Sequence, residues 1–355
     1  MNRYAKIYAW ALLCLLVAAE IALIIVNVND GKALLYVALG FVCAYFFAAF
    51  FHEWGHALFA RSYDMKVVGI KICFLSFEKM GKRWRFRFVN PFFPDHTDVL
   101  PKCGGDMKMR ACMYALGGLI GGGILAFVLL VATVSFLCAG VESDLTLAML
   151  PYCIYLFALN VAPFEYATGK TDMLVYLGIR RGEDSEAAMI NSMEIYGQLF
   201  EGKRYAEIDE KFYFDIPQLM EDDPMFSMNL FLRYRFYLDK NQLEKAGEML
   251  NRLATSAEYL SQKEETELAV ELTYMHSLNG DKAAADECAE LCKPYLSMRS
   301  VTALRVLAAY SAAFGEWDKT DVLLSSAKKA LADEPILGVQ RAEEALVERI
   351  FKQKA

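Results

Sequence analysis

The residue types best suited to chemistry form one pentapeptide, His52-Glu53-Trp54-Gly55-His56. On a helix, histidines four residues apart lie on one face a turn apart, so His52 and His56 can bind one metal ion. Zn²⁺ accepts nitrogen and oxygen ligands and keeps one position open in catalytic sites. Glu53 lies beside the histidines, where its carboxylate can accept a proton from an activated water. The pentapeptide therefore predicts a zinc site with hydrolytic chemistry.

The pentapeptide follows an apolar run, Ala33 to Phe51, that is long enough to form part of a membrane span. A charged side chain at the centre of a span costs about 2.5–3.5 kcal/mol on insertion scales, so such residues usually serve a site. A span needs roughly 17–25 apolar residues. We therefore expect about four transmembrane helices. The four segments of suitable length, the last of them marginal, are residues 7–28, 33–60, 109–139 and 145–162.

Charge divides the chain near residue 180. Residues 1–180 hold 16 Lys and Arg against 12 Asp and Glu, a net charge of +4, whereas residues 181–355 hold 21 against 32, a net charge of −11. The connection 61–110 carries eleven basic residues, which the positive-inside rule places in the cytoplasm. We expect an integral protein of a bacterial cytoplasmic membrane, with both termini in the cytoplasm and the pentapeptide toward that face. The acidity of residues 181–355 argues against a nucleic-acid partner.

A catalytic zinc site needs a third protein ligand, and the end of the fourth apolar segment offers two. Asn160 and Pro163 precede a break in that segment, because proline cannot continue a helix. Glu165 and Asp172 follow the break and are rival ligands. Asp172 comes after Thr171, a residue typical of a helix N-cap, and an apolar helical pattern continues beyond it. Asp172 is the favoured ligand, and the alternative is that it only caps that helix.

The pentapeptide and the later element that runs from Asn160 through Pro163 to Asp172 resemble the two motifs of the site-2 protease family of intramembrane zinc metalloproteases. The resemblance covers roughly residues 33–180. The sequence departs from the family pattern in two places. The spacing from Pro163 to Asp172 is longer, and Met173 stands where the family has glycine.

The resemblance implies a zinc endopeptidase that cleaves a membrane-embedded or membrane-proximal substrate near the cytoplasmic face. In the family, an aspartate completes the metal site with two histidines, a glutamate activates water, and an asparagine helps to hold the substrate or its oxyanion. Carried onto this sequence, the metal ligands are His52, His56 and Asp172, and the catalytic residues are Glu53 and Asn160.

Three further features concern the scaffold of the membrane domain. The glycine-rich stretch 117–123 predicts close packing of its helix against the helix of the pentapeptide, or else a hinge. Segments 66–77 and 83–89 are rich in β-branched and aromatic residues and predict a β-hairpin. Glu20 is a lone carboxylate in the first apolar segment, where it either lines a water path or lies near the outer interface.

Residues 183–355 follow a pattern of helix, short turn and helix. Turn residues recur near positions 202, 240, 280 and 315, at intervals typical of helical-pair repeats. The segment resembles tetratricopeptide repeats with a degenerate consensus, which implies a curved solenoid that binds peptides or proteins. A plainer alternative is that these helices only pack on the membrane domain.

The predicted fold is mainly α: a polytopic zinc metalloprotease domain at 1–182, with about four transmembrane helices and a β-hairpin, followed by a cytoplasmic α-solenoid at 183–355. The predicted activity is that of a zinc endopeptidase regulated or targeted by the repeats. Its expected partners are a membrane protein substrate, a peptide or protein on the repeats, and the lipid bilayer. The alternative function is a catalytically inactive, membrane-anchored adaptor that binds protein partners through its repeats.

Overall fold

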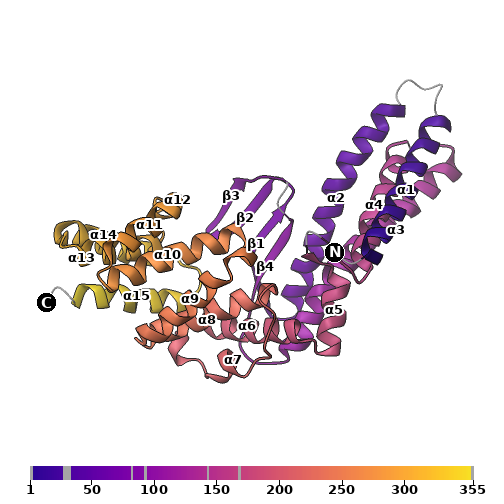
Figure 1. Cartoon of the computed structure of the whole chain (residues 1–355). Helices are drawn as coiled ribbons and strands as arrows, with labels where there is room; N and C mark the ends of the chain where they lie inside the picture. Colours follow the sequence, from indigo (N-terminus) through magenta and orange to yellow (C-terminus); the bar gives the residue numbers. More distant parts are fainter. Residues whose placement is uncertain are drawn as a thin grey trace. The chain divides into compact units, whose positions relative to one another are not determined.

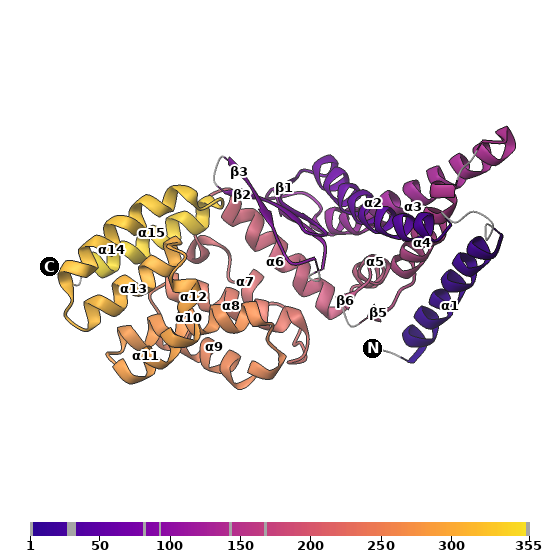
Figure 2. The same cartoon turned by 90° about the horizontal axis from the view of Figure 1, so that it is seen from above.

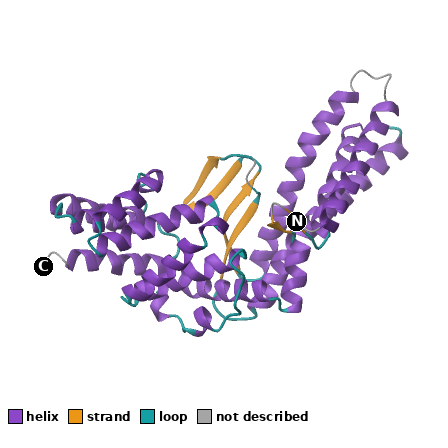
Figure 3. Cartoon of the chain, viewed as in Figure 1, coloured by secondary structure: helices purple, strands orange, loops and turns teal. Residues whose placement is uncertain are grey.

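The computed structural model describes residues 3–26, 33–80, 83–91, 94–141, 144–166 and 169–352 (Figure 1). These residues are mainly helical, and the strands are few and short (Figure 3). The chain divides into two compact units. The membrane unit comprises Met1–Glu78, Trp84–Leu100 and Asp106–Glu183, and the helical unit comprises Lys79–Arg83, Pro101–Gly105 and Asp184–Ala355. The predicted domain boundary at residue 182 lies beside the main division between them.

Among the described residues of the membrane unit, four helices are long and apolar enough to cross a membrane, as predicted. Many of their large apolar side chains are exposed, including Trp10, Phe41 and Phe127. A helix that is apolar all round suits a lipid environment. Helix α2 packs on α3 and α4, and α1 packs mainly on α4. Their bounds are Arg3–Val26 for α1, Ala33–Ser62 for α2, Met107–Ala139 for α3 and Asp144–Val161 for α4.

Glycines bring α2 and α3 into backbone contact, which confirms the close packing predicted for the stretch 117–123. A Cβ on Gly55 would lie 2.1 Å from the carbonyl oxygen of Gly117, and one on Gly121 would lie 2.1 Å from that of Phe51. Small residues permit such approaches between membrane helices. The pentapeptide therefore lies directly against α3.

The larger sheet of the described residues has four strands in the order β3-β2-β1-β4, so the predicted single hairpin was too simple. Segment 66–77 does not form one strand, because the chain turns at Cys73, whose φ is +51°, and β1 pairs antiparallel with β2. Strand β4, which follows residues 91–95, was not predicted. The strands are β1 Met65–Ile72, β2 Leu75–Met80, β3 Arg83–Phe88 and β4 His96–Pro101.

After α4 the chain leaves helical structure, as the proline at 163 predicts. A short ribbon follows, in which β5 (Glu165–Tyr166) pairs antiparallel with β6 (Gly169–Lys170). Helix α5 (Asp172–Arg181) then returns along α3. The ribbon thus delivers the first residue of α5 to the side of α3.

The helical unit contains three helix–turn–helix pairs, α8 with α9, α10 with α11 and α13 with α14. The turn at Gly202 departs from the expected pattern, because short helices η1 and α7 follow it instead of a long partner for α6. The long helices are α6 Asp184–Phe200, α8 Pro224–Asp239, α9 Leu243–Thr255, α10 Gln262–Leu278, α11 Lys282–Leu291, α13 Val301–Ala313, α14 Trp317–Ala330 and α15 Leu337–Lys352. The short ones are η1 Tyr205–Glu207, α7 Lys211–Phe214, η2 Ala257–Tyr259, α12 Lys293–Leu296 and η3 Leu331–Asp333.

Helix α15 lies beside α13 and α14 (Figure 2) and also contacts α6 and α8. Its approach to the end of α6 is close, because a Cβ on Gly338 would lie 2.0 Å from the carbonyl oxygen of Lys203. Arg341 donates to the carbonyl oxygen of Gly202, and Arg349 donates to that of Leu238 at 2.8 Å. Helix α15 therefore forms hydrogen bonds with residues at the ends of α6 and α8, the first two long helices of the unit.

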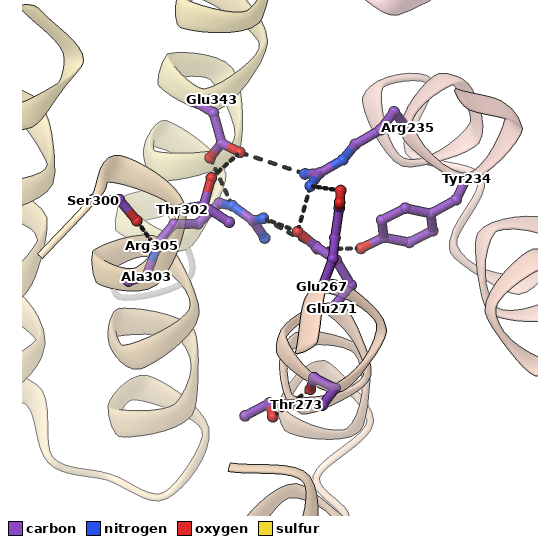
Figure 4. Close-up of polar contacts among 11 residues, drawn as sticks. Tyr234, Arg235, Glu267, Glu271, Thr273, Ser300, Thr302, Ala303, Arg305 and Glu343 are labelled. Carbon is purple, nitrogen blue, oxygen red and sulfur yellow. Dashed lines mark hydrogen bonds and ion pairs between the residues drawn. The ribbon is translucent and has the colours of Figure 1, made fainter. Parts of the chain in front are cut away.

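A buried charge network joins α8, α10, α13 and α15 (Figure 4). Arg305 is fully buried, and its guanidinium pairs with Glu271 at 2.9 Å and with Glu343 at 2.7 Å. Arg235 pairs with Glu271 at 2.8 Å, and the hydroxyl of Tyr234 donates to the same carboxylate at 2.5 Å. Burial would raise the pKa of Glu271, but Arg235 and Arg305 outweigh it and hold that pKa below its ordinary value.

Candidate metal centre

Three ligand-type side chains converge inside the membrane unit. The Nε2 atoms of His52 and His56 are 3.2 Å apart, and Asp172 Oδ2 lies 3.2 Å from the first and 3.3 Å from the second. The two imidazoles project from one face of α2, as their four-residue spacing predicts. Among the described residues, His52, His56 and Asp172 are the group placed closely enough to hold a metal ion. The structure thus brings together the three ligands taken from the sequence.

The start of α5 places Asp172. The hydroxyl of Thr171 accepts from the amide of Leu174 at 3.3 Å, as expected of an N-cap, and donates to the carbonyl oxygen of Ala162 at 2.7 Å. This pair of bonds ties the beginning of α5 to the end of α4. Glu165, the rival ligand, lies exposed in β5 and is not part of the group.

The geometry of the group fits a zinc ion. Tetrahedral coordination with bonds of about 2.0–2.2 Å sets ligand atoms roughly 3.3–3.6 Å apart, close to the 3.2–3.3 Å separations of these three atoms. Asp172 Oδ2 is buried, and apart from the two nearby imidazole nitrogens it has no hydrogen-bond partner among the described residues. A buried carboxylate is unstable without a compensating positive charge, and a bound cation would supply that charge.

Gly118 of α3 faces the same three side chains. A Cβ added there would lie 2.4 Å from His56 Nε2, 2.6 Å from Asp172 Oδ2 and 2.7 Å from His52 Cε1. Only hydrogen in place of a side chain leaves this space open. The glycine therefore keeps clear the volume onto which the three ligands converge.

A backbone carbonyl fixes the orientation of His56. Its Nδ1 lies 2.8 Å from the carbonyl oxygen of Tyr114, and the two rings stack at a centroid distance of 4.6 Å. A carbonyl can only accept, so Nδ1 carries the proton and the lone pair of Nε2 is free for a metal. Such an outer partner is typical of metal-binding histidines.

Glu53 accepts a hydrogen bond from a strand residue, Thr97, that was not predicted from the sequence. Its side chain is 2 % exposed, and Thr97 of β4 donates its hydroxyl to Glu53 Oε2 at 2.7 Å. The same hydroxyl lies 3.1 Å from the carbonyl oxygen of Glu53, and the phenol of Tyr114 donates to the carbonyl oxygen of Thr97 at 2.5 Å. Strand β4 is thereby tied to both α2 and α3 beside the metal ligands.

A cavity of about 230 Å³ opens beside these residues. His52, Glu53 and Asn160 line it, so the predicted asparagine shares one space with the predicted base and a predicted ligand. Asp95 also lines it, and its carboxylate accepts from Lys71 Nζ at 3.0 Å and from the amide of Cys73 at 2.7 Å. The remaining walls are mostly apolar: Ala48, Ala49, Leu119, Leu125, Cys153, Leu156 and Phe157.

Glu20 lies apart from this cavity. It is 6 % exposed on α1, and neither of its carboxylate oxygens has a hydrogen-bond partner in the described part of the chain. It does not line the cavity beside the ligands.

The arrangement can bind one cation through two imidazoles and the carboxylate of Asp172. Glu53 supplies a second carboxylate, which is not part of the ligand group and can therefore accept and donate a proton.

Comparison of the chain with protein-family models, with curated proteins and with solved structures found no match.

Proposed function

We propose that the protein is an intramembrane zinc metalloendopeptidase of the site-2 type. The observation that carries the proposal is the convergence of His52, His56 and Asp172 within 3.3 Å of one another, with Glu53 and Asn160 on the adjoining cavity. Three N and O ligands from the protein with a position left for water are characteristic of catalytic zinc.

The chemistry divides among a few side chains. A bound zinc ion supplies Lewis acidity, which polarises a carbonyl and lowers the pKa of water. Glu53 accepts the proton that the attacking water loses and returns it to the leaving amine. Asn160 donates its amide to the substrate carbonyl from across the cavity. Thr97 keeps the Glu53 carboxylate turned toward that space.

The membrane setting defines the substrate class. The site lies on helices long and apolar enough to span a bilayer, which supports a membrane-embedded or membrane-proximal substrate. The eleven basic residues of the connection 61–110 support cleavage near the cytoplasmic face. Backbone amides within a closed helix are not free to react, because their carbonyls are hydrogen-bonded. A suitable probe is a single apolar span with glycine and proline near its cytoplasmic end.

The helical unit is proposed to lie in the cytoplasm as a tetratricopeptide-like solenoid that recruits or regulates substrate. Its three helix pairs support this reading. The competing function is an inactive, membrane-anchored adaptor, whose support was the unusual spacing around Asp172. The position of Asp172 beside both histidines favours the enzyme.

Zinc content tests the proposal. Purified full-length protein should hold about one zinc per chain, and Gly118→Ala should lose most of it, because the new methyl group occupies the space between the ligands. Gly122→Ala, one helical turn on, is the matched control, since its Cβ would meet only Phe157 Cδ2 at 3.6 Å. Atomic absorption measures the zinc content. Cleavage is measured separately with the membrane-span probe. A zinc-free wild-type protein, or full zinc in Gly118→Ala, would contradict the assignment.

Thr97→Val should lower kcat about tenfold or more, because it removes the hydroxyl donor to Glu53 without changing side-chain size. Zinc content and KM for the probe should stay near wild type, and Thr97→Ser should restore most of kcat. Equal losses in the Val and Ser variants would mean that Thr97 serves only the packing of β4.

A further inference from the structure

A second cavity, of about 290 Å³, lies wholly within the helical unit. Helix α8 forms one wall, Arg252 of α9 another, and the segment before α8 a third. Its lining is Ile216, Pro217, Gln218, Leu219, Phe226, Asn229, Leu230, Arg233 and Arg252. Two arginines therefore share one small space with several apolar side chains.

Neither arginine forms an ion pair with a carboxylate in the described part of the chain. Carboxylates are plentiful in this part of the chain, because acidic residues outnumber basic ones by 32 to 21 between residues 181 and 355. Arg204, Arg235 and Arg341 each pair with an acidic side chain. The two arginines of the cavity are thus cations that face the space without a protein counter-charge.

Both guanidinium groups contact aromatic rings, and that of Arg233 also forms a hydrogen bond. Arg233 Nε donates to the carbonyl oxygen of Tyr213 at 2.8 Å, and its guanidinium lies 5.3 Å from the ring centroid of Phe214. Arg252 lies over the ring of Phe226 at 5.1 Å. With Nε of Arg233 engaged, its terminal nitrogens remain to donate to a ligand. Arg233 is therefore oriented toward the cavity without a ligand, whereas Arg252 lies at its exposed edge.

The two charges repel each other. The pKa of Arg233 is lowered by burial and then by the nearby charge of Arg252. Asn229, on α8 with Arg233, is 8 % exposed and adds an amide to the lining of the cavity. An anion between the arginines would remove the repulsion and accept hydrogen bonds from both guanidinium groups.

We propose that this cavity binds a phosphate monoester with a small apolar body. Two guanidinium groups match the charge of a phosphate dianion, whereas a carboxylate would neutralise one of them. The volume exceeds that of phosphate itself, and Ile216, Leu219 and Leu230 offer an apolar surface to the ester group. The planar guanidinium group of arginine can donate two parallel hydrogen bonds to the oxygens of a phosphate group. The site is independent of the metal centre.

The test is isothermal titration calorimetry of the full-length protein in detergent, at low salt and without phosphate buffer. The probes are phenyl phosphate, inorganic phosphate and benzoate. Phenyl phosphate should bind most tightly and benzoate most weakly, and binding should weaken as salt is added. No detectable binding of phenyl phosphate, or benzoate binding as tightly, would overturn the proposal.

Arg252→Gln should weaken phenyl phosphate binding about tenfold or more, because it removes one charged donor from an exposed position. Arg252→Lys should retain part of the affinity, since it keeps the charge but not the fork. Lys245→Gln changes the same charge on the same helix outside the cavity and should leave binding unchanged. Unchanged binding in Arg252→Gln, with a wild-type melting temperature, would refute the site.

Discussion

Glu53→Gln is expected to abolish cleavage of the membrane-span probe while the chain keeps its zinc. The amide is almost the same size as the carboxylate and can still accept from Thr97, so the local geometry persists. It cannot take a proton, and the loss of a general base lowers rates by about 10²–10⁴-fold. Because Glu53 is not among the three converging ligands, zinc measured by atomic absorption should remain near one ion per chain.

The matched variant is His56→Ala, which removes one of the ligands on the same helix. It should lose both zinc and cleavage, whereas Glu53→Gln loses cleavage alone. Cleavage by Glu53→Gln at the wild-type rate would exclude Glu53 as the base. Loss of zinc in both variants would instead place Glu53 among the ligands.

Arg305→Met should lower the free energy of unfolding of the helical unit by about 3–5 kcal/mol, the cost of breaking a buried ion pair by removing one partner. Arg305 is fully buried between Glu271 and Glu343. Without its positive charge, the negative charges of both buried carboxylates would be only partly neutralised. Urea unfolding followed by circular dichroism measures the change. Lys319→Met, which breaks an exposed pair with Glu316, should cost less than about 1 kcal/mol.

Acid should act on the same network. The folded-state pKa of Glu271 lies below the ordinary value of about 4.5, so its contribution is complete above that pH and is lost as pH falls through the lower folded value. The wild-type unit should therefore lose stability on acidification below about pH 4.5. Arg305→Met should lose less over that range. Equal acid sensitivity of the two proteins would show that the network is not the cause.

The convergence of His52, His56 and Asp172 could be predicted largely from the sequence, because local spacing determines most of it. Two histidines four residues apart on α2 must share a face, and Thr171 marked the helix start that delivers Asp172. Thr97 could not be predicted, because its contact with Glu53 spans 44 residues and depends on how β4 joins the sheet. Pairing of that kind follows from tertiary packing and not from a local pattern.

The fold of the helical unit was predictable in part. Turn residues marked the helix ends at Asn279 and Gly315. In the membrane unit, by contrast, all four long apolar helices followed from hydropathy alone. The irregular chain after Gly202 and the buried Arg305 network were not predictable. An arginine in an apolar helical pattern carries no sign of the carboxylates that two distant helices bring to it.

The attachment of α15 to the beginning of the helical unit has a consequence for synthesis. Arg341 reaches Gly202 across 139 residues of sequence, and Arg349 reaches the end of α8. An open array of repeats can form its contacts in order as the chain leaves the ribosome. Here the contacts of α15 with α6 and α8 form only after α15 itself has been translated, so the unit cannot complete its core before that point.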